Sequence, residues 1–82
     1  MNYVREVADL FLSRCRDVTI LSPIDFVIIA EWEKQEIPLD VILTSINEMC
    51  LEITDRPRVR SVADIQDTVK QDFLNWLQTK QD

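Results

Sequence analysis

The sequence contains no histidine and no glycine. Histidine is the side chain that most often transfers protons near neutral pH, and it is the commonest metal ligand. Glycine-rich phosphate loops and dinucleotide-binding turns need positions that only glycine fills, so both are excluded. Helix ends, where glycine is the usual residue, must here use Asn, Asp or a following proline.

Only two cysteines are present, Cys15 and Cys50, and they form no Cys-x-x-Cys pair. A cysteine nucleophile needs a base to form its thiolate, and no histidine exists for that role. We therefore expect two buried, reduced cysteines in a cytosolic protein. A disulfide between them requires their Cα atoms to lie within about 7 Å, which the sequence does not reveal.

Long uncharged runs are also missing. Residues 18–24 and 41–47 are among the longest, and both are far shorter than the roughly 18 residues that a membrane-spanning helix needs. Charged residues interrupt the start of the chain at Arg5, Glu6 and Asp9, so we expect no signal peptide. These features predict a cytoplasmic protein that does not cross a membrane.

Acidic residues outnumber basic ones by 15 to 9, which gives a net charge of −6. A surface of this charge repels phosphate and disfavours nucleic acid or an anionic membrane as a partner. With 46% apolar and 29% charged residues, the chain has the composition of a folded globular protein. Its 82 residues predict one domain, at 1–78, followed by a frayed polar tail at 79–82.

The carboxylates offer little metal or catalytic chemistry. Glu48 and Glu52 share one helix face, and Asp64 and Asp67 share another. Di-iron bundles, however, need Glu-x-x-His pairs, and the usual calcium loop needs a central glycine. A solvated helix face is the favoured interpretation, and we predict no metal, no cofactor and no enzymatic activity.

Apolar residues recur at helical spacing in four segments. Ser22, Pro23 and Asp25 mark a clear helix start, with an N-cap, a first-turn proline and an acid three residues after the cap. Ser61 and Asp64 repeat the cap and the acid. The predicted helices cover residues 2–16, 22–35, 38–53 and 62–78.

The second of these helices contains five consecutive apolar residues, 26–30. Such a helix is apolar nearly all round and must be enclosed by its neighbours. We therefore expect a compact all-α domain of four helices with the second at its centre. Any part of it left uncovered would become a contact for another chain. The predicted core is Phe11, Phe26, Ile28, Ile29, Trp32, Leu39, Ile42, Leu43, Ile46, Ile65, Val69, Phe73 and Trp76.

One basic feature stands out, the alternating arginines Arg56, Arg58 and Arg60. In an extended loop, alternation places the three guanidinium groups on one side, where they can bind phosphates or an acidic peptide. The alternative is that they pair with the protein's own acids, Glu48, Glu52 and Asp64. The third helix itself carries three carboxylates and no basic residue, which is unsuited to reading DNA.

The middle of the chain resembles the helical DnaD-like domains of bacterial replication-initiation proteins and phage replisome organisers. The residues that carry the resemblance are Leu21-Ser22-Pro23, Phe26, Ile29, Trp32, Ile37-Pro38, Val41-Ile42 and Ser45-Ile46. It covers about residues 21–46 and implies an all-α module that makes protein contacts and, in some members, binds DNA. The same Ser-Pro…Trp…Ile-Pro signature is similar to that of short uncharacterised bacterial proteins, for which it implies no function.

The chain departs from the DnaD-like pattern near its end. That pattern has Tyr and Ile eight and four residues before a tryptophan, whereas Trp76 is preceded by Thr68 and Asp72. The tail is also not basic, so the family's DNA-binding residues do not transfer to this chain. We expect a small cytoplasmic protein-interaction or adaptor module that binds a protein partner or itself. The alternative is a DnaD-like accessory factor that contacts nucleic acid through Arg56–Arg60.

Overall fold

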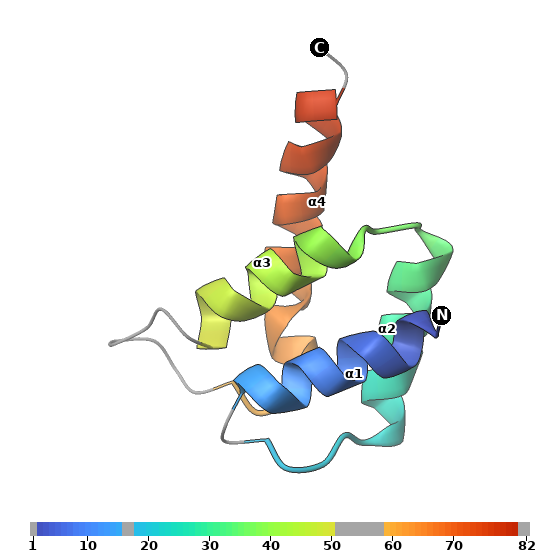
Figure 1. The fold of residues 1–82 in the computed structure, drawn as a ribbon, viewed down its shortest axis with the longest axis vertical. Coiled ribbons are helices and arrows are strands. Elements are labelled where there is room, and N and C mark those ends of the chain that lie inside the picture. The colour runs from blue at the N-terminus through green and yellow to red at the C-terminus, as the bar shows by residue number, and fades with distance from the viewer. Residues whose placement is uncertain (1, 16–17, 51–58, 81–82) are drawn as a thin grey trace.

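The structure, a computed structural model, describes residues 2–15, 18–50 and 59–80. Its helices are α1 (Tyr3–Arg14), α2 (Pro23–Lys34), α3 (Leu39–Cys50), the short 3-10 helix η1 (Val62–Ile65) and α4 (Gln66–Lys80) (Figure 1). The predicted all-α fold with four α-helices is confirmed, and the described ranges contain no strand. The predicted fourth helix is divided into η1 and α4, which continues through Lys80, and residues 51–53 of the predicted third helix lie outside the described ranges.

The predicted helix starts form as their capping residues require. Backbone N–H groups in the first turn of a helix have no partner within the helix, and side-chain oxygens bind them instead. The Asn2 side chain accepts a hydrogen bond from the Arg5 N–H at 3.1 Å, and Asp64 accepts bonds from the N–H groups of Arg60 and Ser61 at 2.8 and 3.2 Å. The starts of α1 and η1 are thus fixed by residues next to them in the sequence.

The end of α2 uses a residue that we did not expect. Glu36 adopts a left-handed conformation with φ of 59°, a conformation that glycine occupies at most such helix ends. Its N–H donates to the Glu33 carbonyl at 3.0 Å, and the Ile37 N–H donates to the Trp32 carbonyl at 3.1 Å. These two bonds are those of a Schellman motif, here built around glutamate at a steric cost of about 1 kcal/mol.

Every helix contributes to one hydrophobic core. The largest fully buried side chains include Phe11 of α1, Ile29 of α2, Ile42 and Ile46 of α3, and Ile65 of η1. Most of the predicted core is confirmed. Fully or nearly buried are Phe11, Ile28, Ile29, Trp32, Ile42, Ile46, Ile65 and Val69, while Leu39, Leu43, Phe73 and Trp76 are partly buried. Phe26 was predicted wrongly, because its side chain is 43% exposed.

The position of α2 also differs from the prediction. It packs against α1 and η1, whereas α3 contacts α1, η1 and α4, so the described α2 is not wrapped by three helices. The physical reason is thickness. The shortest dimension of the molecule is 18 Å, which holds about two layers of helices of 10–12 Å each. No helix in such a layered molecule is covered on all sides.

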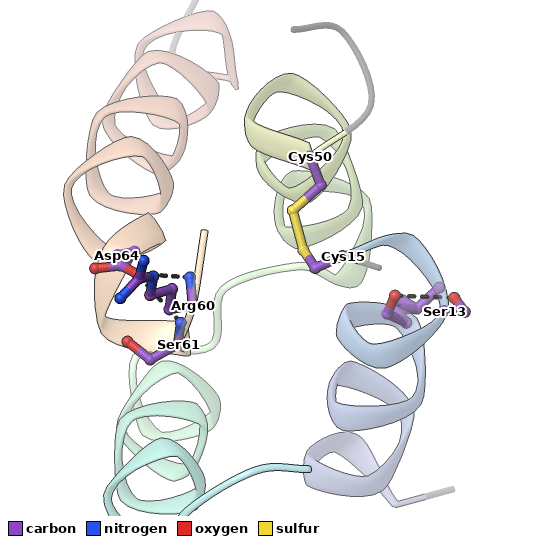
Figure 2. Close-up of a disulfide and its surroundings, with 7 residues drawn as sticks. Ser13, Cys15, Cys50, Arg60, Ser61 and Asp64 are labelled. Carbon is purple, nitrogen blue, oxygen red and sulfur yellow. Dashed lines mark hydrogen bonds between the residues drawn. A yellow bond between two sulfur atoms is a disulfide. The ribbon is translucent and has the colours of Figure 1, made fainter. Parts of the chain in front are cut away.

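A disulfide joins Cys15 and Cys50, and the prediction of two reduced cysteines is therefore wrong. Their Cα atoms lie 5.2 Å apart, within the range that the bond requires. Cys15 caps the C-terminal end of α1 and Cys50 is the last residue of α3, so the bond ties these two helix ends together (Figure 2). Sequence periodicity places both residues on apolar faces but does not show that the two ends meet.

Within the described ranges, no helix is both long enough and apolar enough to span a lipid bilayer. The same residues include no group of three or more side chains arranged to hold a metal ion.

Candidate functional site

A groove of 730 Å³ runs along one side of α1. Its other walls are the connector that follows α1 and the first turn of α2. Figure 1 shows this connector turning back beside α1 before α2 begins. The residues that line the groove are Asn2, Val4, Arg5, Ala8, Asp9 and Leu12 of α1 and its cap, Thr19, Ile20 and Leu21 of the connector, and Phe26 of α2.

Apolar side chains form the floor of the groove and much of its edge. Ala8 and Leu21 are buried in the core beneath it, and Val4 and Leu12 are half-buried against the same core. Ile20 and Phe26 stand at the edge, 80% and 43% exposed. A hollow that is apolar both inside and at its edge is suited to side chains of another protein.

Two further exposed apolar residues lie on the first turns of α2, outside the lining of the groove. Ile24 and Val27, one turn apart, are 59% and 55% exposed. With Ile20 and Phe26 they are four of the five large apolar side chains that are most exposed in the described ranges, the fifth being Leu74 of α4. Single exposed apolar residues are normal, but a contiguous group usually marks a contact surface. We call Ile20, Ile24, Phe26 and Val27 the apolar rim.

A buried carboxylate decides which side of α2 faces outward. Asp25 is only 3% exposed. One oxygen accepts bonds from the N–H and hydroxyl of Ser22, at 2.8 and 3.0 Å, and the other accepts the Val62 N–H at 3.0 Å. Asp25 therefore caps α2 and η1 together. Because residues three and four positions apart share a helix face, turning Asp25 inward also turns Ile28, Ile29 and Trp32 inward and leaves Phe26 and Val27 outside.

The charged groups of the groove are balanced. Arg5 and Asp9 lie one turn apart on α1, and both are exposed. The ion pair formed in the described part of the chain joins Lys34 to Glu31, at 3.6 Å on α2, and does not involve either residue. The groove thus offers one free cation and one free anion beside an apolar surface.

Tyr3 holds α1 against the turn between α2 and α3. Its hydroxyl donates to the Ile37 carbonyl at 2.7 Å. Burial, aided by the negative charge of Glu33, raises the pKa of Tyr3 from 10.0 to about 12. A smaller hollow of 380 Å³ surrounds this tyrosine and is edged by Glu33, Glu36 and Asp40. A tyrosine with a raised pKa keeps its proton near neutral pH and is a poor general base.

A second buried polar contact joins α3 to α4. The Ser45 side chain is fully buried; its hydroxyl lies 2.7 Å from Asp72 Oδ2 and 3.0 Å from the Val41 carbonyl, and it donates to one of them at a time. The contact satisfies a hydroxyl that would otherwise be buried without a partner. Its role is to fix how α4 packs on α3.

The arginines predicted to bind a partner are not seen together. Arg56 and Arg58 lie outside the described residues. Arg60 is exposed, and its backbone N–H is bonded to Asp64 (Figure 2). Of the carboxylates considered as metal ligands, Asp64 instead caps a helix, because it binds the Ser61 N–H. Asp67 is exposed, and Glu52 lies outside the described residues.

Sequence reasoning did not find the groove. Val4, Ala8 and Leu12 lie on the apolar face of α1, and helical periodicity does not show whether such a face is covered or left open. Ile20 lies between two predicted helices, where periodicity gives no information. One signal was present, the apolar run 26–30, which is longer than one buried face requires.

Comparison with protein families, with curated proteins and with solved structures finds no match to this chain. The DnaD-like resemblance of residues 21–46 therefore stays a prediction, and the function is argued from the geometry alone.

Proposed function

We propose that this protein is a non-enzymatic interaction module that binds other polypeptide through the groove and the apolar rim. The observation that carries the proposal is the combination of a 730 Å³ hollow with Ile20 and Phe26 exposed at its edge. Burying large apolar side chains of this kind stabilises a complex by roughly 25 cal/mol for each Å² removed from water. An amphipathic helix, which presents apolar residues three and four positions apart, is the segment that such grooves receive.

Two further features support a binding role rather than catalysis. The chain has no histidine, and the disulfide leaves no free thiol to act as a nucleophile. The charged residues of the groove, Arg5 and Asp9, are both exposed to solvent rather than enclosed in a cavity. The groove thus has binding surface but no obvious reactive group.

The proposal is tested by selecting peptides from a displayed library of helical sequences against the wild-type protein. We expect enriched peptides with apolar residues at helical spacing and an affinity that falls about tenfold or more in Phe26→Gln. Leu74→Gln is the matched control, because Leu74 is 44% exposed against 43% for Phe26 but lies on α4. Failure to enrich any peptide, or equal binding to both variants, contradicts the proposal.

A DnaD-like accessory factor that binds nucleic acid through Arg56, Arg58 and Arg60 is the second candidate. The exposed position of Arg60 supports it, while the net charge of −6 opposes it. If this candidate is correct, the protein binds nucleic acid at low salt, the affinity falls steeply as salt rises, and the triple alanine variant does not bind. Absence of binding at low salt removes it.

A cytoplasmic location stays our prediction, and the disulfide provides its test. Disulfides persist in oxidising compartments and are rare in the cytosol. Alkylation of free thiols in intact cells, followed by mass measurement, reports whether Cys15 and Cys50 are joined there. A fully oxidised pair in growing cells would contradict the cytoplasmic prediction.

A further inference from the structure

We propose that the occupant of the groove is a second copy of this chain, docked across a two-fold axis. Each copy then inserts part of its apolar rim into the groove of the other. The inference rests on the proposed function in one respect, that the groove is a contact surface for polypeptide.

The shape of the groove suits a second copy of the chain. In a two-fold dimer the same patch serves both copies, so it must hold both the hollow and the group that fills the hollow. The groove meets this condition, because Ile20 and Phe26, which line it, are also among the most exposed large apolar side chains. Leu74, the comparable exposed residue on α4, is not among the residues that line this groove.

The charges of the groove also suit a second copy. Two copies of a chain with net charge −6 repel one another. The groove is a place where this repulsion is locally absent, because its lining includes one cation and one anion, Arg5 and Asp9, beside apolar residues. A surface of this kind lets two acidic molecules approach closely.

The same two charges favour a two-fold arrangement. Arg5 and Asp9 are four residues apart on α1 and therefore lie on one face of the helix. A two-fold axis that crosses α1 between them reverses the direction of the helix in the second copy. Each Arg5 then lies opposite Asp9 of the other copy, and two ion pairs form from residues that make no ion pair within the described part of a single chain.

The size of the surface limits the affinity. Stable interfaces commonly bury about 800 Å² on each partner, and the groove with its rim is a small part of a molecule whose accessible surface is 5777 Å². We therefore expect dissociation in the micromolar range rather than the nanomolar range. Salt screens both the repulsion between the acidic copies and the two ion pairs at the contact but leaves apolar burial intact, so we expect the dimer to depend only weakly on salt. Binding to nucleic acid instead weakens steeply as salt rises.

The test is sedimentation of the full chain over a range of concentrations, beginning well below and ending well above the micromolar range. We expect the mass to rise from the 9.7 kDa of one chain towards twice that value. Ile20→Gln and Phe26→Gln should each weaken self-association about tenfold or more. Leu74→Gln should leave it within about twofold, the effect of a residue outside the contact. All three substitutions leave the net charge unchanged.

A charge exchange tests the two-fold geometry itself. Arg5→Asp alone and Asp9→Arg alone should each weaken the dimer, because like charges then meet across the axis. The double variant restores opposite pairs and should recover most of the wild-type affinity. Both residues are exposed, and circular dichroism of each variant checks that the fold is kept.

Three results would overturn the inference: a single chain at every concentration, a dimer that Leu74→Gln disrupts while Phe26→Gln does not, or a double charge variant no better than the single ones. These outcomes are separable from failure of the proposed function. If the wild-type protein stays monomeric while selected peptides bind in a Phe26-dependent manner, the second copy is the wrong occupant and the groove is still a binding site.

Discussion

The two sides of α2 differ far more in their surroundings than in their composition. On the inward side, Ile29 is fully buried and Trp32 is 5% exposed. On the outward side, Phe26 and Val27 are 43% and 55% exposed, although they are as apolar as their inward neighbours. The difference arises from Asp25, whose bond to the Val62 N–H fixes one face of the helix against η1. It teaches that an apolar helix in a thin, two-layered domain has one face buried in the core and another exposed to solvent.

The largest effect expected from this comparison comes from substituting one aromatic residue on each side. Trp32→Ala should lower the free energy of unfolding by about 3–5 kcal/mol, because it removes a large buried ring. Phe26→Ala should lower it by less than about 1 kcal/mol, since much of the ring is already in water. Urea unfolding of both variants measures the two losses. Similar losses would mean that the outward side of α2 is also structural.

Removing the disulfide should separate stability from binding. Replacing both Cys15 and Cys50 by serine should cost about 3 kcal/mol, because the bond closes a long loop between residues 35 positions apart. The bond ties α1 to α3, and neither cysteine lines the groove. The serine variant should therefore unfold at lower denaturant concentration but, while folded, self-associate as the wild type does. Loss of self-association in the folded variant would contradict this separation.

Asp25 affects both sides of α2, because its bond to Val62 buries one face of the helix and thereby determines which residues lie on the other face. Asp25→Ala leaves the buried Val62 N–H without an acceptor and should cost about 2 kcal/mol. Asp64→Ala removes a comparable cap at an exposed position, and should cost only about 1 kcal/mol. Thermal unfolding compares the two variants. We further expect Asp25→Ala, and not Asp64→Ala, to shift the amide NMR signals of the groove, because only Asp25 orients α2.

The local features of this fold follow from the sequence, whereas the arrangement of the helices does not. Ser22 with Asp25 and Ser61 with Asp64 mark helix starts because capping depends on residues three positions apart. Ile28, Ile29 and Trp32 were correctly predicted as core residues, but the sequence predicted a helix enclosed on all sides rather than one buried on a single face. The exposure of Phe26 depends on how many layers the whole chain forms, and no local pattern contains that information.

The groove and the disulfide were missed for a related reason. Both are made by segments distant in the sequence, α1 with the start of α2 in one case and the ends of α1 and α3 in the other. Sequence periodicity says which face of each helix is apolar, but not which faces meet. The alternating arginines Arg56, Arg58 and Arg60 are the opposite case. Their pattern is clear in the sequence, but only Arg60 lies in the described part of the chain, so no site formed by all three is seen.

The end of α2 offers a smaller, stabilising change. Glu36 has a φ of 59°, and a residue with a Cβ atom is strained there while glycine is not. Glu36→Gly should raise the free energy of unfolding by about 1 kcal/mol, partly offset by the greater freedom of glycine in the unfolded chain. Glu36→Ala, which keeps the Cβ atom, is the control and should not stabilise. Both variants lie at the far end of α2 from the apolar rim, so neither should alter self-association.

The smallest effect concerns Tyr3. Its hydroxyl binds the Ile37 carbonyl and so holds α1 to the turn that follows the buried side of α2. The folded protein raises the pKa of Tyr3 from 10.0 to about 12. Between these two pH values the unfolded chain has lost the proton that the folded chain keeps, so stability falls as pH rises. The contribution is complete below pH 10 and is lost as pH passes 12.

Tyr3→Phe removes both the titration and the hydroxyl bond to Ile37. It should cost about 1 kcal/mol at neutral pH and flatten the loss of stability between pH 10 and 12 relative to the wild type. Because Tyr3 is the chain's only tyrosine, the ultraviolet absorbance of tyrosinate reports its pKa directly. A midpoint near pH 10 in the folded protein would show that the Tyr3 hydroxyl is in water. The start of α1, which forms one end of the groove, would then not be held by Tyr3.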